Sequence, residues 1–273
     1  HSDSMGARDS GWIQLYSENA QEAYDNIIQA TRIAEDREVL LPVMVCLDGF
    51  IISHALENLY VLEDSVVRRF VGEYSPDHTL LDVDNPVTMG PLDLYDFYFE
   101  HKRQQAEAMN MATEVIPRVA AAFEELTGRR YGFFDGYRLD DAEVAVVVLG
   151  STAGTARVVV DELRRSGVRA GVLKLRVFRP FPLAQLSAAL RGKKAVAVMD
   201  RAESFSTTGG PVFTEVAAAL SGHGDAPHLR SYIYGLGGRD VGPADIRRVF
   251  DEITALAAGR TSLPRVSYLG VRE

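Results

Sequence analysis

The stretch AEVAVVVLGSTAGTARVVVDELRRS, residues 142–166, decides the fold because a strand, a turn and a helix follow one another in it. Residues 144–150 are almost entirely apolar, as in a strand buried on both faces of a parallel sheet. A turn of small residues follows, and we expect a helix over residues 154–166. The stretch is therefore a βα unit, from which helix-covered parallel sheets are built.

The same alternation continues to residue 257 and indicates a parallel α/β domain. Further strands are expected at residues 171–178, 195–200 and 231–234, and helices at residues 183–190, 211–220 and 243–257. Four βα units at short spacing predict one parallel sheet with helices on its faces. The change of pattern near residues 128–141 predicts two domains, residues 1–130 and 131–273.

The first part of the chain predicts one helix between two strands. A polar loop, residues 1–11, leads into a short strand that ends at residue 16. A helix is expected over residues 17–35, with Ser17 as its cap and acidic residues in its first turn. The near-continuous apolar run at residues 39–47 predicts a strand buried on both faces.

A connector and a long helix complete this part. Residues 74–96 are rich in proline and aspartate and show little periodicity, which predicts a long loop. A helix is expected over residues 97–127, ending at Gly128. Pro117 lies inside it and is expected to kink or split it.

Composition excludes several classes of function. The chain has 273 residues and a formal charge of −9, which argues against a nucleic-acid partner. We see no secretory leader pattern and no apolar run near the ~20 residues of a membrane span. Cys46 is the one cysteine, so this chain alone builds no disulfide and no iron–sulfur cluster. These features predict a cytoplasmic protein without a metal site of its own.

Three turns between a strand and a helix could hold an anion through free backbone N–H groups. They contain Ser151 and Thr152, Gly209 and Gly210, and Gly237 and Arg239. The first two turns are better explained by close packing of strand and helix and by helix capping. The third lies at the carboxyl end of the last predicted strand, where ligands of α/β sheets bind. Its arginine could instead pin the turn.

A second group of candidates lies in the first part of the chain. Asp48 follows the apolar run, with Ser53 and His54 a few residues later. Asp48 could orient a ligand or cap a helix, and His54 could transfer a proton or be structural. The opening segment contributes His1, Asp3 and Arg8, as polar groups that line a site or bond one another. None of these patterns forms a self-sufficient catalytic constellation, so no catalytic residue is assigned.

Taken together, these blocks resemble a known family. The segments HSDSMGARDSGW (1–12), LPVMVCLDGFIISH (41–54), RYGFFDGY (130–137), LKLRVFRPFP (173–182) and YGLGGRD (234–240) occur in the order typical of α-subunits of pyruvate:ferredoxin oxidoreductases and their branched-chain 2-oxoacid relatives. The resemblance covers essentially the whole chain. It implies the carboxyl-terminal portion of a thiamine-pyrimidine-binding domain followed by a domain similar to the transketolase C-terminal domain.

The resemblance also implies a reaction and partners. It implies oxidative decarboxylation of pyruvate or a branched-chain 2-oxoacid with coenzyme A. Thiamine diphosphate with magnesium is expected at an interface with a partner subunit. Iron–sulfur clusters are expected on partner subunits of the β, γ and δ types, with ferredoxin as electron acceptor. The chain would then be inactive alone.

The family's α-subunit carries a further N-terminal stretch with a glutamate that activates thiamine, and no position of this sequence matches it. We therefore expect the segments 1–8 and 48–54 to position parts of the active site rather than to perform chemistry. The alternative is a non-catalytic assembly or docking module with a transketolase-like scaffold.

Overall fold

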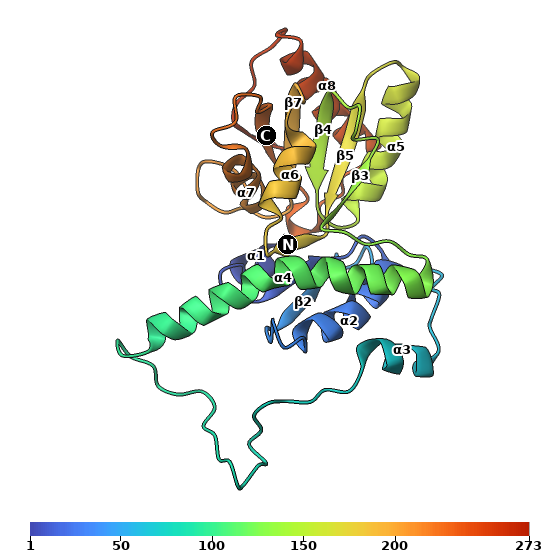
Figure 1. Ribbon diagram of the computed structural model, residues 1–273. Helices are drawn as coiled ribbons and strands as arrows, with labels where there is room; N and C mark the ends of the chain where they lie inside the picture. Colours follow the sequence, from blue (N-terminus) through green and yellow to red (C-terminus); the bar gives the residue numbers. More distant parts are fainter. Residues whose placement is uncertain (273) are drawn as a thin grey trace.

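A computed structural model describes residues 1–272 and shows two β-sheets joined by one chain (Figure 1). The larger sheet has six strands in the order β3-β5-β4-β7-β8-β9, and the smaller has three in the order β2-β1-β6. The six strands are β3 Phe134–Tyr137, β4 Val144–Val148, β5 Ala170–Leu175, β7 Ala195–Asp200, β8 His228–Ile233 and β9 Val266–Tyr268. All neighbours in this sheet are parallel except β3 and β5, so the predicted parallel α/β fold is confirmed.

Helices cover both faces of the larger sheet. Side chains at 144, 146 and 148 of β4 pack against α5 (Thr152–Arg165) and α8 (Pro243–Ala257). Those at 145 and 147 pack against α6 (Leu183–Leu190) and α7 (Pro211–Leu220). Because successive strand residues point to opposite faces, one all-apolar strand supplies the core of both layers.

The smaller sheet is built mainly from the first part of the chain. It contains β1 (Ile13–Tyr16) and β2 (Val43–Cys46). Three helices accompany it, α2 Ala20–Ala34, α3 Asp64–Val71 and α4 Tyr98–Thr127. Buried apolar residues of β1, α2 and α4 form one cluster with Phe70 of α3. This cluster holds the amino-terminal unit together.

The third strand of the smaller sheet, β6 (Val177–Arg179), comes from the second part of the chain. The predicted strand at residues 171–178 is therefore two strands, since the chain leaves the larger sheet after β5 and crosses at Arg176. Strand β6 pairs antiparallel with β1, with Gln14 opposite Arg179. One short run of residues thus belongs to both sheets.

Several expectations at the amino-terminal end are wrong in detail. Residues Ser2–Gly6 form the short helix α1 rather than a loop. The cap of α2 is Asn19, whose side chain accepts from Glu22 N at 2.8 Å, and not Ser17. Strand β2 is half-buried rather than buried on both faces, because it lies at the sheet edge with β1 as its neighbour.

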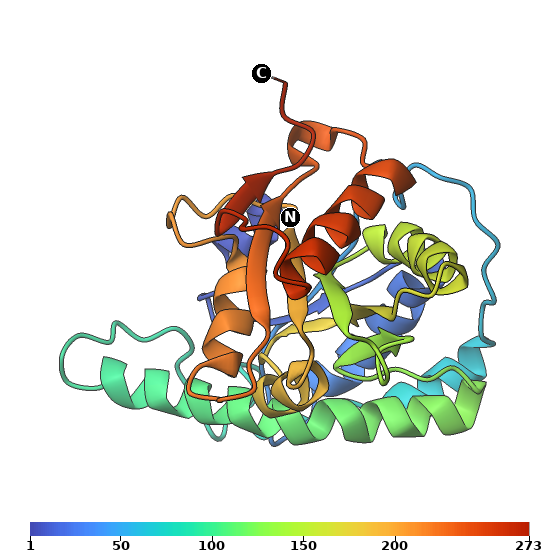
Figure 2. The same cartoon turned by 90° about the horizontal axis from the view of Figure 1, so that it is seen from above.

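The connector is confirmed as a long segment without helix or strand between α3 and α4. In both views the connector and the first turns of α4 project beyond the rest of the chain (Figures 1 and 2). Helix α4 runs through Pro117 as a single helix of 30 residues and ends at Gly128 in the left-handed conformation. The expected splitting at Pro117 is therefore wrong.

Candidate functional site

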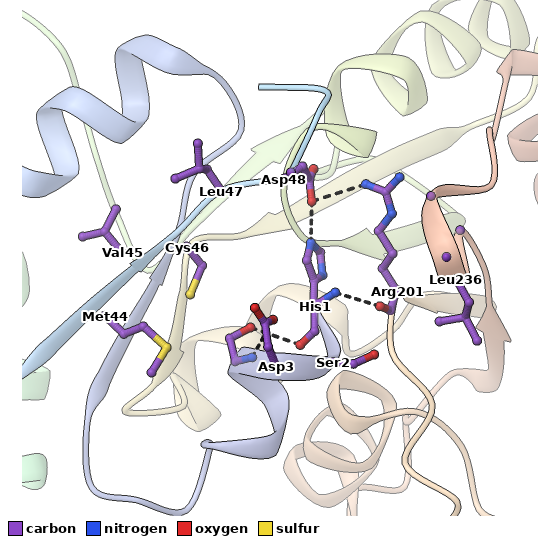
Figure 3. Close-up of a pocket in the computed structure, with 15 residues that line it drawn as sticks. His1, Ser2, Asp3, Met44, Val45, Cys46, Leu47, Asp48, Arg201 and Leu236 are labelled. Atoms are coloured by element: carbon purple, nitrogen blue, oxygen red, sulfur yellow. Dashed lines mark hydrogen bonds and ion pairs between the residues drawn. The ribbon is translucent and has the colours of Figure 1, made fainter. Parts of the chain in front are cut away.

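A cavity of about 630 Å³ lies where the loops of the two sheets meet (Figure 3). Its walls come from α1, from the end of β2, from the residue after β7 and from the glycine turn after β8. The lining residues are His1, Ser2, Asp3, Ser4, Met44, Val45, Cys46, Leu47, Asp48, Gly49, Arg201, Gly235, Leu236, Gly237 and Gly238. The carboxyl ends of parallel strands, where α/β proteins bind ligands, thus face this cavity.

Asp48 is the centre of the polar contacts in this wall. One carboxylate oxygen contacts His1 Nε2 at 2.6 Å and Arg201 at 3.3 Å. The other accepts from the backbone N–H of Ser151 at 2.7 Å and from its hydroxyl at 2.5 Å. Asp48 is 3% exposed, so these contacts replace the water that a buried carboxylate loses. Asp48 therefore ties the end of β2 to α1, to the residue after β7 and to the turn before α5.

The turn before α5 is shaped to receive this carboxylate. Gly150 has φ +65°, and a Cβ there would lie 2.6 Å from an Asp48 carboxylate oxygen. The turn places the Ser151 N–H at the start of α5, where the helix dipole favours an anion. The anion-binding geometry suggested for Ser151 exists, and an aspartate of the same chain occupies it.

Arg201 contacts a buried aromatic ring as well as Asp48. Its guanidinium lies 5.9 Å from the centre of the Tyr234 ring. The Tyr234 hydroxyl donates to Thr152 Oγ1 at 2.8 Å, and burial raises the pKa of Tyr234. Figure 3 shows Arg201 and His1 directed at the same carboxylate of Asp48. Thr152 therefore acts on Arg201 only through the Tyr234 side chain, which lies between them.

The floor near β2 is closed by a hydroxyl network. The Tyr16 hydroxyl donates to Ser4 Oγ at 2.8 Å, and Asp3 accepts from the Ser4 N–H at 2.7 Å. Burial raises the pKa of the Cys46 thiol to about 11. Cys46 therefore remains protonated at neutral pH and is not an activated nucleophile.

The predicted turn at Gly209 and Gly210 also receives an internal carboxylate. Asp200 accepts from the N–H groups of Val212 at 2.7 Å and of Phe213 at 3.1 Å at the start of α7. Burial is the largest influence on this carboxyl and raises its pKa to about 7. The N–H groups at the start of α7 are therefore bonded to Asp200, and the Gly210 N–H donates to Ser231 Oγ at 3.2 Å.

The structure brings together some of the predicted residues and not others. His1, Asp3, Asp48 and Gly237 line the cavity. Ser53 and His54 are exposed outside it, where the Ser53 hydroxyl accepts from the Phe50 N–H and His54 faces the Phe50 ring. They do not join Asp48 in this structure.

The two remaining predicted arginines are engaged elsewhere. The backbone carbonyl of Arg8 accepts from the Arg179 side chain at 3.1 Å. The guanidinium of Arg8 lies near Asp9. Arg239 donates to the carbonyl oxygen of Gly270 at 2.6 Å, which pins the glycine turn. Neither arginine lines the cavity.

The side chains available for a metal are few. Within residues 1–272, no group of three histidine, cysteine or acidic side chains is arranged to hold a metal ion. Over the same residues, none of the helices has the length and apolarity needed to cross a membrane.

Two family models match the chain. One, described as "Pyruvate flavodoxin/ferredoxin oxidoreductase, thiamine diP-bdg", matches residues 1–121, and "Pyruvate:ferredoxin oxidoreductase core domain II" matches residues 142–246. A Thermotoga maritima protein named pyruvate synthase subunit PorA is 52% identical, over 100% of this chain and 69% of its own length. The chain belongs to the pyruvate:ferredoxin oxidoreductase family.

Other relatives in the pyruvate:ferredoxin oxidoreductase family differ in name. The PorA subunit of Methanocaldococcus jannaschii is 42% identical over 93% of this chain and 64% of its own length. The α-subunit of the NADH-dependent phenylglyoxylate dehydrogenase of Aromatoleum evansii is 37% identical over 100% and 67%. The chain therefore spans about two thirds of the length of these relatives. These matches confirm the predicted family and subunit type.

A solved structure from Magnetococcus marinus, a 2-oxoglutarate:ferredoxin oxidoreductase, has the same fold. Its TM-score is 0.54 at 16% identity, covering 88% of this chain and 42% of that one. The residue ranges matched by the two family models meet at the cavity. Asp48 belongs to the first matched range, and Ser151 and Arg201 belong to the second.

Sequence reasoning missed Arg201, which lies directly after β7. The rule that selected Asp48, a polar residue at the carboxyl end of an apolar strand, would also have selected Arg201.

Proposed function

We propose that this chain supplies the α-type part of a thiamine diphosphate-dependent 2-oxoacid:ferredoxin oxidoreductase in which the cavity wall around Asp48 forms an edge of the active site. The observation that carries this proposal is the meeting of both matched family ranges at one cavity. Asp48 comes from the first range, and its partners Ser151 and Arg201 come from the second.

The proposed reaction is the oxidative decarboxylation of a 2-oxoacid. The 2-oxoacid anion and coenzyme A give acyl-coenzyme A, CO₂, one proton and two electrons, which two oxidised ferredoxins accept one each. Pyruvate is the proposed substrate because the PorA relatives are named pyruvate synthase subunits. Branched-chain 2-oxoacids are the second choice from the sequence resemblance.

The cofactor is proposed to be shared with a partner subunit. The side chains of residues 1–272 do not form a magnesium site, and Asp48 is already bonded to three residues. We therefore assign no ligand of the diphosphate to this chain. When bound, thiamine diphosphate supplies the carbanion chemistry of decarboxylation. Iron–sulfur clusters are proposed for the partner subunits.

The residues of this chain are proposed to act by positioning. Asp48 fixes the His1 ring, the Arg201 guanidinium and the start of α5 in one arrangement. Loss of that arrangement would displace α1 and the glycine turn, which form two walls of the cavity. Small displacements of positioning groups cost activity because reacting groups lose alignment. The proposed partners are β-, γ- and δ-type subunits and ferredoxin, in the cytoplasm.

The test uses the enzyme assembled from this polypeptide and its partner subunits. Ferredoxin or viologen reduction is followed with pyruvate, a branched-chain 2-oxoacid and 2-oxoglutarate, each with coenzyme A. We expect pyruvate to be the best substrate, and Asp48→Asn to lower kcat at least tenfold while the assembly remains intact. Asp225→Asn removes an exposed ion pair with Arg191 and serves as the matched control.

The same assay separates the second candidate function. Intact assembly without any 2-oxoacid-dependent reduction would support the non-catalytic docking module. Wild-type turnover in Asp48→Asn would reject the positioning role of this wall while leaving the family activity in place.

A further inference from the structure

A second cavity of about 910 Å³ shares no lining residue with the first. It lies between α2, the segment from Arg130 to Gly136, the end of β5 and the carboxyl end of α6. Its lining residues are Glu22, Arg130, Tyr131, Gly132, Phe134, Asp135, Gly136, Leu139, Asp140, Lys174, Arg176, Ala188, Ala189, Arg191 and Lys193. The positioning network around Asp48 does not use it.

Some charges of this cavity are already neutralised. Lys174 donates to both carboxylate oxygens of Glu22, at 2.7 and 2.9 Å. Asp135 accepts from Arg157 at 2.7 Å, and Arg191 donates to Asp225 at 2.8 Å. Glu18 also accepts from Arg157, at 2.5 and 2.9 Å, and lies 3.5 Å from Lys174, so these pairs carry one surplus negative charge.

Arg176 is different because, within residues 1–272, it is buried with no carboxylate among its hydrogen-bond partners, although Glu22 and Asp25 lie near it. Its side chain is 1% exposed, and its N–H groups donate to Asn26, Gln29 and the Gly132 carbonyl, which are all neutral. Its guanidinium also lies 5.1 Å from the centre of the Tyr131 ring. Buried charges are normally paired with an opposite charge, so this cation leaves positive potential at the cavity.

Two further cations add to this potential. Lys193 is buried and donates to the carbonyl oxygens of Leu139 at 2.7 Å and Ala142 at 3.5 Å, so it too bonds neutral groups. Arg130 is exposed and makes no ion pair or side-chain hydrogen bond within residues 1–272. Asp140 is the one lining carboxylate outside the pairs described above. The three cations Arg176, Lys193 and Arg130 thus exceed Asp140 and the surplus charge of Glu18 by one, in a chain whose formal charge is −9.

The rest of the wall is apolar and aromatic. Tyr131, Phe134, Leu139, Ala188 and Ala189 complete the lining. Cavities of roughly 300–1,000 Å³ with an apolar wall and a few convergent polar groups are typical of small-molecule sites. We propose that this cavity binds a phosphorylated small molecule of the nucleoside diphosphate type, with its anionic groups at Arg130 and Lys193 and its ring on the apolar wall.

The experiment is isothermal titration calorimetry of the 273-residue chain with pyrophosphate and with ADP. We expect both to bind, and ADP to bind more tightly because the apolar wall adds contacts that pyrophosphate lacks. A charge-assisted contact is worth enough that Arg130→Ala should weaken binding about tenfold. Lys193→Met should weaken it similarly.

Arg260→Ala is the matched control, since Arg260 is also exposed and does not line the cavity. It should bind both probes like the parent chain. Because Arg130 makes no ion pair or side-chain hydrogen bond in the part of the chain that the structure describes, its variant remains informative even if Lys193→Met fails to fold. The proposal is overturned if neither probe binds at millimolar concentration, or if Arg130→Ala and Arg260→Ala bind equally well. Binding of pyrophosphate but not ADP would overturn the role of the apolar wall. The outcome does not depend on oxidoreductase activity.

Discussion

At the scale of single residues, Asp48 carries contacts from three separate segments of the chain. Its carboxylate accepts from Ser151 and lies against His1 and Arg201, and it is almost completely buried. Removing one partner of a buried ion pair is costly because the remaining charges lose compensation. Asp48 is therefore the residue whose neutralisation tests the junction most directly.

We expect Asp48→Asn to lower the free energy of unfolding by about 2–4 kcal/mol, since Asn can still accept from the Ser151 N–H. Urea unfolding followed by circular dichroism measures this. Asp225→Asn breaks a pair whose side chains are 44% and 47% exposed and should cost less than about 1 kcal/mol. Equal losses in the two variants would show that Asp48 is no more important than a surface acid.

Asp200 gives the chain a pH-dependent element of stability. Burial raises its pKa to about 7, whereas an aspartate in the unfolded chain ionises near pH 4. Between these values the folded protein holds a proton that the unfolded chain has released. Its contribution to stability therefore decreases as the pH rises from about 4 to about 7.

We expect Asp200→Asn to remove this decrease. The difference in free energy of unfolding between the parent chain and the variant should shift in favour of the variant as the pH rises across that window. Urea titrations at several pH values measure the difference, which cancels the carboxylates that both proteins share. A difference independent of pH would mean that Asp200 is ionised in the folded chain throughout.

The structure brings only some of the predicted residues to one cavity, because strand ends are visible in sequence and distant contacts are not. Asp48 was selected because it follows an apolar run. Its contact with Ser151 joins positions 103 residues apart, and no local pattern reports such a pairing. Ser53 and His54 were grouped with Asp48 by proximity in sequence, although the chain turns away after β2.

At the scale of elements, the turn before α7 shows how closely a backbone must approach a side chain. A Cβ on Gly210 would lie 2.3 Å from the Asp200 carboxylate that caps this helix. Gly210 has an ordinary φ of −71°, so the requirement for glycine here is steric. The turn and its capping acid therefore form one unit.

We expect Gly210→Ala to destabilise the protein by at least about 2 kcal/mol, because the added methyl group displaces a buried capping carboxylate. Gly224→Ala is the control, since a Cβ there meets nothing within 4 Å. Thermal unfolding of both variants measures the effect. A melting temperature unchanged in Gly210→Ala would show that the Asp200 side chain moves freely.

Helices whose first residue carries a clear sequence signal were predicted with the bounds that the structure shows. Helices α7 and α8 begin with Pro211 and Pro243, whose fixed φ suits the first helical position, and both were placed correctly. Strand β3 contains Asp135 and Gly136, which disfavour strands, and tertiary pairing with β5 overrides that preference. Helix α1 is too short to show a helical period.

At the scale of the whole molecule, the connector separates two parts that are packed together. Residues 72–97 contain no helix or strand, while buried residues of β1, α2 and α4 form one cluster across the gap. The sequence contains no lysine or arginine between Arg69 and Lys102. Trypsin therefore has no cleavage site in the connector, whereas proteases that cut at apolar residues do.

Chymotrypsin or thermolysin is expected to cut the native chain near Leu80, Leu81 or Tyr95, which are exposed. The two fragments should stay associated because the cluster holds them. Gel electrophoresis, intact mass and size-exclusion chromatography measure this. Trypsin is the control and should leave residues 70–101 uncut. Separation of the fragments on the column would show that the cluster is too weak to hold the unit.

The parallel α/β architecture followed from the alternation after residue 141, while the domain boundary near residue 130 stays a prediction. What sequence could not show was the exchange of a strand between sheets, since residues 171–178 form one apolar run. The break at Arg176 depends on its bonds to Asn26 and Gln29 of α2, which are distant in sequence.

The path from β5 into β6 has a consequence for how such chains can be shuffled during evolution. Strand β6 completes the smaller sheet with β1 and β2 although it is encoded more than 130 residues after them. A recombination event at residue 130 would give an offspring protein whose β1 meets a foreign β6. Inheritance of the two units as one block is therefore favoured, unless both parents carry compatible versions of this strand.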